Sequence, residues 1–337
     1  MDKPLLFAII GCGRIAARHA EHISTYGKLV AVCDCDVSKA AEFGAANRVP
    51  FYHDLDTLLT EVRLLDVVVI CTPNGLHASH SIKALKAGKH VLCEKPMAIT
   101  VADCRNMISA AAEASKVLLV VKQNRYNPPV VALKKALQDH ILGKVFSFQL
   151  SCFWNRDIAY YKDSWKGTKD MDGGTLFTQF SHFIDLLYWM FGDIEKVNAF
   201  TENFAHHGVI QFEDTGAVIL QFKNGIIGTL NFTVNACMKN MEGSLSVFGE
   251  NGTVKIGGQY LNKLEYESIQ NYTLGPLPPG KPSNEYGTYQ GSMSNHDKVY
   301  ENLLEIINKG KQPDTTCFEA LKTVEIISAI YESANKS

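Results

Sequence analysis

The stretch LLFAIIGCGRIA, residues 5–16, decides the fold of this chain. Its apolar half predicts a buried strand, and Gly11 and Gly13 predict a tight turn into a helix. Gly11 permits the sharp turn, Gly13 lets the backbone approach a pyrophosphate, and the small Ala16 lets the helix pack closely on the strand. The start of the helix then offers unpaired N–H groups to the anion. This pattern predicts a dinucleotide-binding unit.

An acidic residue follows this turn at the spacing that a dinucleotide site requires. Asp34 ends the next apolar run, where a carboxylate accepts a hydrogen bond from the ribose 2′-hydroxyl and repels a 2′-phosphate. We therefore predict NAD rather than NADP as the cofactor. Asp36 is the second candidate for this role, and the alternative is that it caps the helix that begins near Ser38.

Length and composition are typical of a two-domain globular protein. The chain has 337 residues, 46% of them hydrophobic, and a formal net charge of −2 without long runs of either sign. We therefore expect no nucleic-acid or membrane partner. The nine cysteines are scattered without a Cys-x-x-Cys pair, which indicates free thiols in a reducing compartment and no metal site. With no apolar span of about 18 residues, the chain is expected to be cytoplasmic.

Residues 1–121 alternate apolar runs with helical patterns, which predicts an α/β unit with a doubly wound parallel sheet of the Rossmann type. Its strands are expected at residues 5–10, 29–33, 67–71, 90–93 and 117–121.

Residues 122–337 predict a second, α+β domain with a mainly antiparallel sheet, which we expect to bind the substrate and to carry oligomer contacts. Its strands are expected at residues 144–153, 197–202, 216–222, 228–235, 244–248 and 252–256. Residues 271–295 predict a long loop. Two terminal helices are expected at 297–309 and 318–334, and the prediction leaves open whether they pack on the first domain.

The carboxyl ends of parallel strands carry the ligand contacts in such sheets, so the residues after each strand are candidates for the site. Lys95 follows the fourth strand beside the expected nicotinamide position, where its ammonium would stabilise negative charge on a substrate oxygen. The alternative is a surface lysine paired with Glu94. The expected cofactor contacts beyond the glycine turn and Asp34 are Arg14, Ile15, Thr72, Pro73, Asn74, Glu94 and Gln123.

The apolar segment 175–191 predicts one helix with a polar stripe that contains Thr178, Gln179, His182 and Asp185. The stripe follows two glycines, which would let a ligand approach the start of the helix. The alternative is a core helix whose polar groups satisfy one another.

Several separated motifs resemble the glucose–fructose oxidoreductase and inositol dehydrogenase (Gfo/Idh/MocA) family over essentially the whole chain. They are the glycine turn, Cys71-Thr72-Pro73-Asn74 with His77, Glu94-Lys95-Pro96, and Gly173-Gly174 followed by His182 and Asp185. The resemblance implies that Lys95 anchors the sugar hydroxyl being oxidised, that His182 is the general acid/base, and that His77 belongs to the cofactor site.

A second group of motifs comprises Gln123-Asn124-Arg125-Tyr126-Asn127-Pro128, Trp154-Asn155-Arg156, Tyr160-Tyr161, Trp165-Lys166-Gly167-Thr168 and Thr178-Gln179-Phe180-Ser181-His182. These motifs resemble the branch of the family that oxidises the 3″-hydroxyl of UDP-N-acetylglucosamine or its uronic acid. This resemblance implies that arginines meet phosphate or carboxylate and that aromatic rings stack on uracil or sugar. The alternative for Trp154, Trp165 and the tyrosines is domain packing. The implied substrate contacts are Arg125, Asn127, Arg156, Tyr160, Trp165, Thr168 and Gln179.

One position departs from the family pattern. Many inositol-type members place an aspartate four residues before the histidine, and here that residue is Thr178. Asp185, Gln179 or the substrate would then orient His182, or Lys95 would carry more of the proton transfer.

These features predict an NAD-dependent dehydrogenase that acts on a UDP-linked N-acetylated hexose or hexuronate and works as a homo-oligomer, a tetramer or dimer. One alternative is an inositol or free-aldose dehydrogenase of the same family. The other is a non-catalytic protein that senses NAD.

Overall fold

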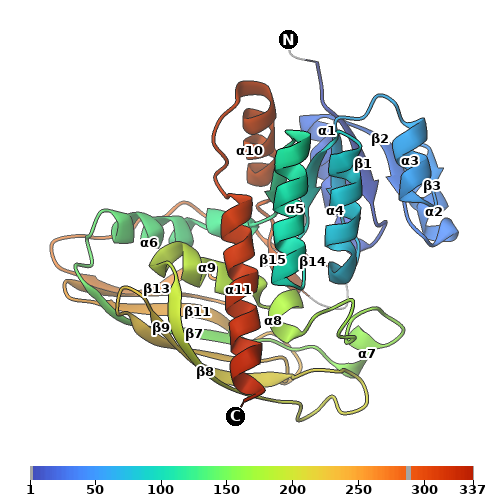
Figure 1. Cartoon of the computed structure of the whole chain (residues 1–337). Helices are drawn as coiled ribbons and strands as arrows, with labels where there is room; N and C mark the ends of the chain where they lie inside the picture. Colours follow the sequence, from blue (N-terminus) through green and yellow to red (C-terminus); the bar gives the residue numbers. More distant parts are fainter. Residues whose placement is uncertain (1–2, 286–289, 337) are drawn as a thin grey trace. The chain divides into compact units, whose positions relative to one another are not determined.

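The chain folds into two compact units, as the computed structural model of residues 3–285 and 290–336 shows (Figure 1). Within these ranges, the first unit comprises residues 3–122 and 296–324, and the second comprises residues 123–295 and 325–336. The chain thus leaves the first unit after residue 122 and returns to it at residue 296.

The first unit is built on a six-stranded parallel sheet with the order β3-β2-β1-β4-β5-β6. This arrangement confirms the predicted doubly wound fold. One of its two central strands, β4, is buried on both faces, which explains why its sequence is a continuous apolar run. The strands are β1 (Leu6–Ile10), β2 (Lys28–Cys33), β3 (Phe51–Tyr52), β4 (Val67–Ile70), β5 (His90–Cys93) and β6 (Leu118–Val120).

The helices of this unit begin where the sequence supplies caps. Asp36, Asp54 and Thr100 accept hydrogen bonds from the first backbone N–H groups of α2, α3 and α5. In Figure 1, α4 and α5 lie side by side. The helices are α1 (Arg14–Tyr26), α2 (Val37–Asn47), α3 (Leu55–Glu61), η1 (Asn74–Leu76), α4 (His77–Lys86), α5 (Val101–Ala114) and α10 (His296–Lys309).

The second unit contains a seven-stranded sheet with the order β13-β12-β11-β7-β10-β9-β8. Only β10 and β7 among these neighbours pair in parallel, which confirms the predicted mainly antiparallel sheet. The strands are β7 (Val145–Phe153), β8 (Ile194–Glu202), β9 (Thr215–Phe222), β10 (Ile227–Thr233), β11 (Glu242–Gly249), β12 (Gly252–Gly257) and β13 (Lys263–Ile269).

The remaining elements of the second unit are short, apart from two helices. They are η2 (Gln123–Tyr126), α6 (Pro128–Gln138), α7 (Ile158–Tyr161), α8 (Thr175–Thr178), α9 (Ser181–Phe191), β14 (Ser283–Glu285) and β15 (Gln290–Met293). The last helix, α11 (Cys317–Ala334), begins in residues of the first unit and ends in residues of the second.

Besides the two-residue strand β3, which was not predicted, three local features differ from the sequence prediction. Residues 263–269 form a strand that was not predicted, because its charged residues interrupt the apolar alternation. The expected loop at 271–295 contains the β14–β15 pair, and residues 286–289 lie outside the described residues. The single helix expected at 175–191 is two helices, because Phe180 departs from helical geometry between them.

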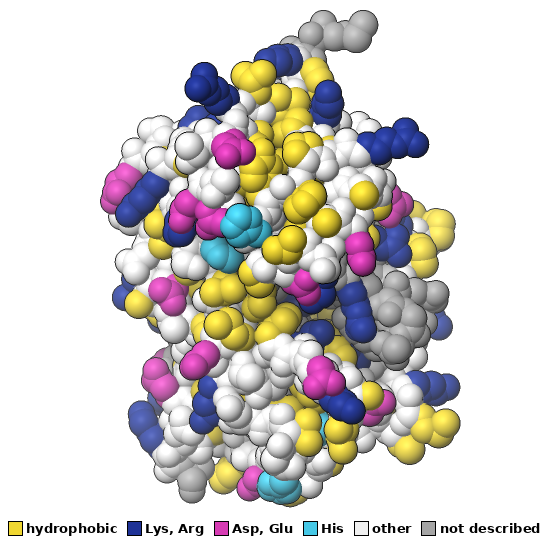
Figure 2. Space-filling view, turned by 90° about the vertical axis from the view of Figure 1, so that its right-hand side faces the viewer, with side chains coloured by type: hydrophobic (Ala, Val, Ile, Leu, Met, Phe, Trp, Pro, Cys, Tyr) yellow, Lys and Arg dark blue, Asp and Glu magenta, His cyan; other side chains and the backbone are white. Residues whose placement is uncertain are grey.

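The surface carries charges of both signs. On the face in Figure 2, basic and acidic side chains are interspersed with polar and apolar ones. None of the helices in residues 3–285 and 290–336 combines the length and apolar character that a membrane crossing requires. All nine cysteines are free thiols.

Candidate active site

The turn between β1 and α1 fits the pyrophosphate of a dinucleotide. Gly11 has a φ of +92°, and a Cβ placed there would lie 2.6 Å from the carbonyl oxygen of Cys71. A Cβ at Gly13 would meet nothing within 4 Å, so the space before the first turn of α1 is open. Because Gly13 caps α1 without a side chain, the first N–H groups of the helix face this space. The observed turn therefore suits an anion.

Asp34 is held at the end of β2, beside the glycine turn. Its Oδ2 accepts a hydrogen bond from the backbone N–H of Cys12 at 2.8 Å, and its Oδ1 accepts one from that of Asp36 at 2.9 Å. The side chain of Asp36 instead accepts bonds from the N–H groups of Ser38 and Lys39. Asp36 is thus a helix cap, and Asp34 remains the candidate that binds the ribose.

His77 ties together the loops that follow β4 and β5. Its Nδ1 lies 2.6 Å from the carbonyl oxygen of Pro96, and its Nε2 lies 2.9 Å from that of Thr72. Burial lowers the pKa of His77, although both carbonyls favour its protonated form. Its observed partners are backbone groups, so its effect on a cofactor acts through the two loops.

Glu94 contacts both the backbone of Lys95 and two histidines in the first unit. The Oε2 atom of Glu94 accepts a hydrogen bond from the backbone N–H of Lys95 at 3.1 Å. Its Oε1 atom lies against the imidazoles of His19 and His296. A cofactor contact at Glu94 stays a prediction, and the structure shows three protein partners that the sequence did not suggest.

In the second unit, His182 lies near the start of α9 with 3% of its surface exposed. Its Nε2 is 3.2 Å from Nε2 of Gln123, a residue predicted to contact the cofactor. An amide that donates to Nε2 keeps that nitrogen unprotonated and places the ring proton on Nδ1. Gln123 is thus a partner of the imidazole that the sequence did not suggest.

Asp185, one of the groups expected to orient His182, is bound by Arg125. The guanidinium donates from Nε to Oδ2 at 2.7 Å and from Nη2 to Oδ1 at 2.8 Å. Both side chains are almost fully buried, and Arg125 also stacks on Trp189. This two-point pair neutralises the charge of Arg125, which was predicted to meet a phosphate or carboxylate of the substrate.

Three other predicted substrate contacts form one network. Arg156 donates from Nε to Oε1 of Gln179 at 2.8 Å, and Gln179 donates from Nε2 to the Tyr160 hydroxyl at 2.9 Å. The Arg156 guanidinium lies 5.2 Å from the Tyr160 ring centre and also donates to Asn240. The break between α8 and α9 places Gln179 in this network rather than in a continuous helical stripe.

Trp154 and the other predicted substrate residues make packing contacts or hydrogen bonds within the protein. Trp154 packs against Phe180 and Phe183, as the domain-packing alternative predicts. The Thr168 hydroxyl donates to the carbonyl of Trp165 and stabilises that turn. Asn127 is buried and donates to the carbonyl of Tyr260. Binding of substrate by Trp165, Thr168 and Asn127 stays a prediction.

Two buried acids at the start of α8 were missed. Burial raises the pKa of Asp172 to about 6 and that of Glu213 to about 8. Asp172 accepts hydrogen bonds from the Thr178 hydroxyl and from the N–H of Gly167, and Glu213 accepts one from the Tyr331 hydroxyl at 2.7 Å. A carboxylate therefore contacts the threonine that replaces the aspartate of inositol-type members, but it comes from Asp172.

Gly11 should contribute mainly to stability, whereas Gly13 should contribute mainly to NAD binding. We predict that Gly11→Ala lowers the free energy of unfolding by about 3 kcal/mol, because the Cβ clashes with a backbone carbonyl at positive φ. Gly13→Ala should melt within about 2 °C of the wild type but bind NAD at least about tenfold more weakly. Thermal melts and calorimetric titration with NAD measure both. Equal loss of stability in the two variants would contradict this assignment.

Glu213 should make stability depend on pH. Its folded-state pKa is raised to about 8, so the folded chain binds more protons than the unfolded chain between about pH 4.5 and 8. Stability is then lost as the pH rises through this window. We predict that Glu213→Gln removes this loss and raises the melting temperature at pH 8.5 by about 5 °C relative to wild type. The prediction is disproved if the melting temperatures of the wild type and of Glu213→Gln change with pH in the same way from pH 5 to 8.5.

Comparisons with known proteins agree with this architecture. Residues 5–122 match the family model described as "Oxidoreductase family, NAD-binding Rossmann fold", and residues 134–337 match "Oxidoreductase family, C-terminal alpha/beta domain". The first model confirms NAD as the predicted cofactor.

Solved structures resemble the chain over its whole length. The WlbA dehydrogenase from Bordetella pertussis, in complex with NADH and UDP-GlcNAcA, is 32% identical, covers 99% of this chain and 97% of its own, and has a TM-score of 0.89. The WlbA enzyme from Chromobacterium violaceum, with the same ligands, is 33% identical over 100% of this chain and 95% of its own, with a TM-score of 0.89.

Among curated proteins, D-apiose dehydrogenase of Paraburkholderia graminis is 26% identical over 98% of this chain and 87% of its own length. An inositol 2-dehydrogenase/D-chiro-inositol 3-dehydrogenase of Halalkalibacterium halodurans is 27% identical over 75% of this chain and 71% of its own. Together, the matches of both family models identify the chain as a member of the NAD-dependent Gfo/Idh/MocA oxidoreductase family.

Proposed function

We propose that this protein oxidises the 3″-hydroxyl of a UDP-linked N-acetylated hexose or hexuronate to a 3-keto sugar nucleotide. The observation that carries the proposal is the full-length similarity to two WlbA dehydrogenases crystallised with NADH and UDP-GlcNAcA. The residues of the second unit agree with it, because Arg156, Gln179 and Tyr160 form one polar network with aromatic neighbours.

The proposed reaction removes a hydride from the carbinol carbon and a proton from its oxygen. NAD, when bound, accepts the hydride. The Lys95 ammonium donates a hydrogen bond to the substrate oxygen and stabilises its developing negative charge. His182 accepts the proton at Nε2, its unprotonated nitrogen, once the substrate hydroxyl replaces the Gln123 amide that donates to this atom in the free protein. Oxidation of the alcohol then leaves the C=O of the 3-keto sugar.

Arg156 suits an anionic part of the substrate better than Arg125 does. The hydrogen-bond partners of Arg156 include Gln179, Asn240 and the carbonyl of Asn155, which are all neutral. The Asp185 carboxylate, by contrast, cancels the charge of Arg125. We therefore assign an internal structural role to Arg125, whose charge is paired with Asp185, and keep for Arg156 the contact with the pyrophosphate or the hexuronate carboxylate that the resemblance implies.

We predict that the purified protein forms NADH when UDP-GlcNAcA is added, as measured by absorbance. Lys95→Ala should lower kcat by about 1,000-fold, because the alkoxide loses its cation, and His182→Asn by about 100-fold, because the base is lost. Adding a 2-oxo acid as hydride acceptor allows turnover if the cofactor stays bound. Unchanged rates in both variants, or no turnover of any UDP-sugar, would refute the proposal.

A second candidate is a dehydrogenase of free sugars or inositol, which the similarity to the D-apiose and inositol dehydrogenases favours. Arg156→Ala separates the two. An enzyme that acts on UDP-sugars should show a KM for the sugar nucleotide raised about tenfold or more, whereas an inositol dehydrogenase would turn over myo-inositol without a nucleotide and would tolerate the change. An NAD-sensing protein would show no turnover in either assay.

We also propose that the chain forms a homo-oligomer through the exposed face of the second sheet, and that it is cytoplasmic, in keeping with its free thiols. Cross-strand register places Phe200, Ile219, Ile227 and Phe248 on one side of the sheet, and each is at least 40% exposed. Such an apolar face is typical of a subunit contact.

Ile219→Glu should therefore convert the oligomer to a monomer, because it places charge at the centre of this face. Light scattering after gel filtration measures the mass. Phe318→Glu is the matched control, because Phe318 is similarly exposed but lies outside this sheet. A monomeric wild type, or an Ile219→Glu oligomer of unchanged mass, would contradict the proposed interface.

A further inference from the structure

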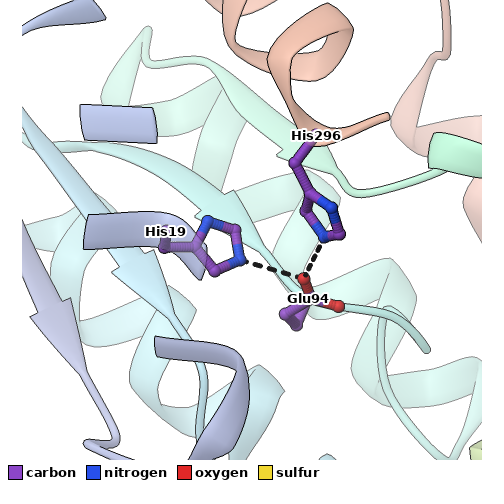
Figure 3. Close-up of side chains that lie close together, drawn as sticks. All are labelled: His19, Glu94 and His296. Carbon is purple, nitrogen blue, oxygen red and sulfur yellow. Dashed lines mark hydrogen bonds and ion pairs between the residues drawn. The ribbon is translucent and has the colours of Figure 1, made fainter. Parts of the chain in front are cut away.

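A buried cluster of one carboxylate and two imidazoles lies at the end of β5 in the first unit. Oε1 of Glu94 is 2.9 Å from Nε2 of His19 and 3.3 Å from Nε2 of His296 (Figure 3). His19 belongs to α1, and His296 is the first residue of α10. The sequence motifs included Glu94 but neither histidine, so the function assigned above leaves this cluster unexplained.

The hydrogen bonds indicate which ring nitrogens of the two histidines carry a proton. Burial disfavours the charged form of Glu94, but hydrogen bonds from both histidines outweigh it and hold its pKa well below the usual range. A carboxylate only accepts, so Nε2 of each ring carries a proton. Nδ1 of His19 then accepts a bond from the Tyr300 hydroxyl at 2.8 Å. The three partners therefore form a directed chain from Tyr300 through His19 to Glu94.

A metal ion would require a different arrangement. The three ligand atoms lie within 4.8 Å of one another, and two histidines with a glutamate are a common zinc set. Zinc binds the Nε2 lone pair, however, whereas here Nε2 of both rings donates to the carboxylate. Donation from both Nε2 atoms and coordination of a metal by them therefore exclude each other, and we take the cluster in its hydrogen-bonded state.

The second oxygen of Glu94 connects the cluster to Lys95. Oε2 accepts a hydrogen bond from the backbone N–H of Lys95 at 3.1 Å. One carboxylate thus joins three elements: α1, which begins at the glycine turn, α10, and the backbone that carries the proposed substrate anchor. If Glu94 rotates or becomes protonated, the backbone at Lys95 loses a charge-assisted bond.

We propose that His19 and His296 are positioning residues for Lys95, which they hold in its catalytic orientation through the carboxylate of Glu94. The inference rests on the proposed function, in which the Lys95 ammonium binds the substrate oxygen. A small displacement of that ammonium weakens transition-state stabilisation more than it weakens ground-state binding. Loss of a histidine should therefore lower kcat and change KM little.

Burial also sets the charge state of other ionisable groups around Glu94. Cys71, Cys93 and Tyr300 are buried, and burial raises the pKa of each, so all three are neutral at physiological pH. His77 and the Lys95 ammonium are further neighbours, and His22 stacks on the His296 ring; burial lowers the pKa of both His77 and His22. Lys95 is thus the cation among these neighbours, and the two histidines are the donors that keep Glu94 charged.

The decisive comparison is His296→Leu with His296→Gln. Leucine fills similar space without a donor, whereas the glutamine amide nitrogen can occupy the position of Nε2 and donate to Glu94. We expect His296→Leu to lower kcat with UDP-GlcNAcA about 30-fold, with the KM values for NAD and sugar within about threefold. His296→Gln should restore at least a third of the wild-type kcat.

The pH profile provides a readout that a purely structural role would not change. With His19 as its one remaining histidine donor, buried Glu94 should take up a proton at a higher pH than in the wild type, because burial favours its neutral form. In His296→Leu, kcat should therefore fall on the acidic side of neutrality and recover as the pH rises. The wild type and His296→Gln should lack this added acidic limb.

Hydrogen exchange tests the bond to Lys95 without any substrate. A peptide that covers residues 92–97 should exchange at least tenfold faster in His296→Leu than in the wild type, and at the wild-type rate in His296→Gln. If His296→Leu does not fold, His296→Asn replaces it, because its shorter amide withdraws the donor from Glu94. Metal content is measured on the wild type, and stoichiometric zinc would overturn the proposal.

The Lys95→Ala variant distinguishes failure of the proposed function from failure of the positioning role of the histidines. If Lys95→Ala keeps full activity, the proposed function fails, whatever the histidine variants show. If Lys95→Ala is inactive but His296→Leu folds with wild-type kcat, pH profile and exchange rate, the function stands and the positioning role fails. A lower kcat in His296→Leu that His296→Gln does not restore also contradicts it.

Discussion

Parallel pairing of the first six strands is the constraint on which the cofactor unit depends. Because parallel strands all run in one direction, their carboxyl ends lie along one edge of the sheet. Gly11, Asp34, Thr72 and Glu94 each follow a different strand, and the sheet alone brings them to that edge. The hydrogen bond from Cys12 to Asp34 and the close approach of Gly11 to Cys71 join neighbouring loops there.

This constraint explains why the first unit was predictable from sequence. An apolar run of four to six residues, a glycine turn and a capping acid are local signals, so the strands β1, β2, β4, β5 and β6 could be located. The two-residue β3 is too short to give such a pattern. The edge strand β13 carries the charged residues Lys263, Glu265 and Glu267. Such charges prevent unwanted pairing of an edge strand, and they also interrupt the apolar alternation from which a strand is predicted.

The candidate site was predictable as a set of residue types but not as a set of partners. Arg125 and Arg156 look equivalent in sequence, yet one pairs with Asp185 and the other with neutral acceptors. Likewise, Gln123 contacts His182 from 59 positions away. Asp172 and Glu213 become chemically unusual only through burial. Long-range packing decides each of these outcomes, and a single sequence carries no direct signal of it.

The position of β7 has a consequence for how the second unit assembles. β7 is the first strand of its sheet in the chain, but it lies in the middle, between β10 and β11. During synthesis, both of its edges stay unpaired until residues 227–249 have left the ribosome. An apolar strand with two open edges is prone to pair with other chains, so this unit should depend on chaperones more than a sheet built from sequential hairpins.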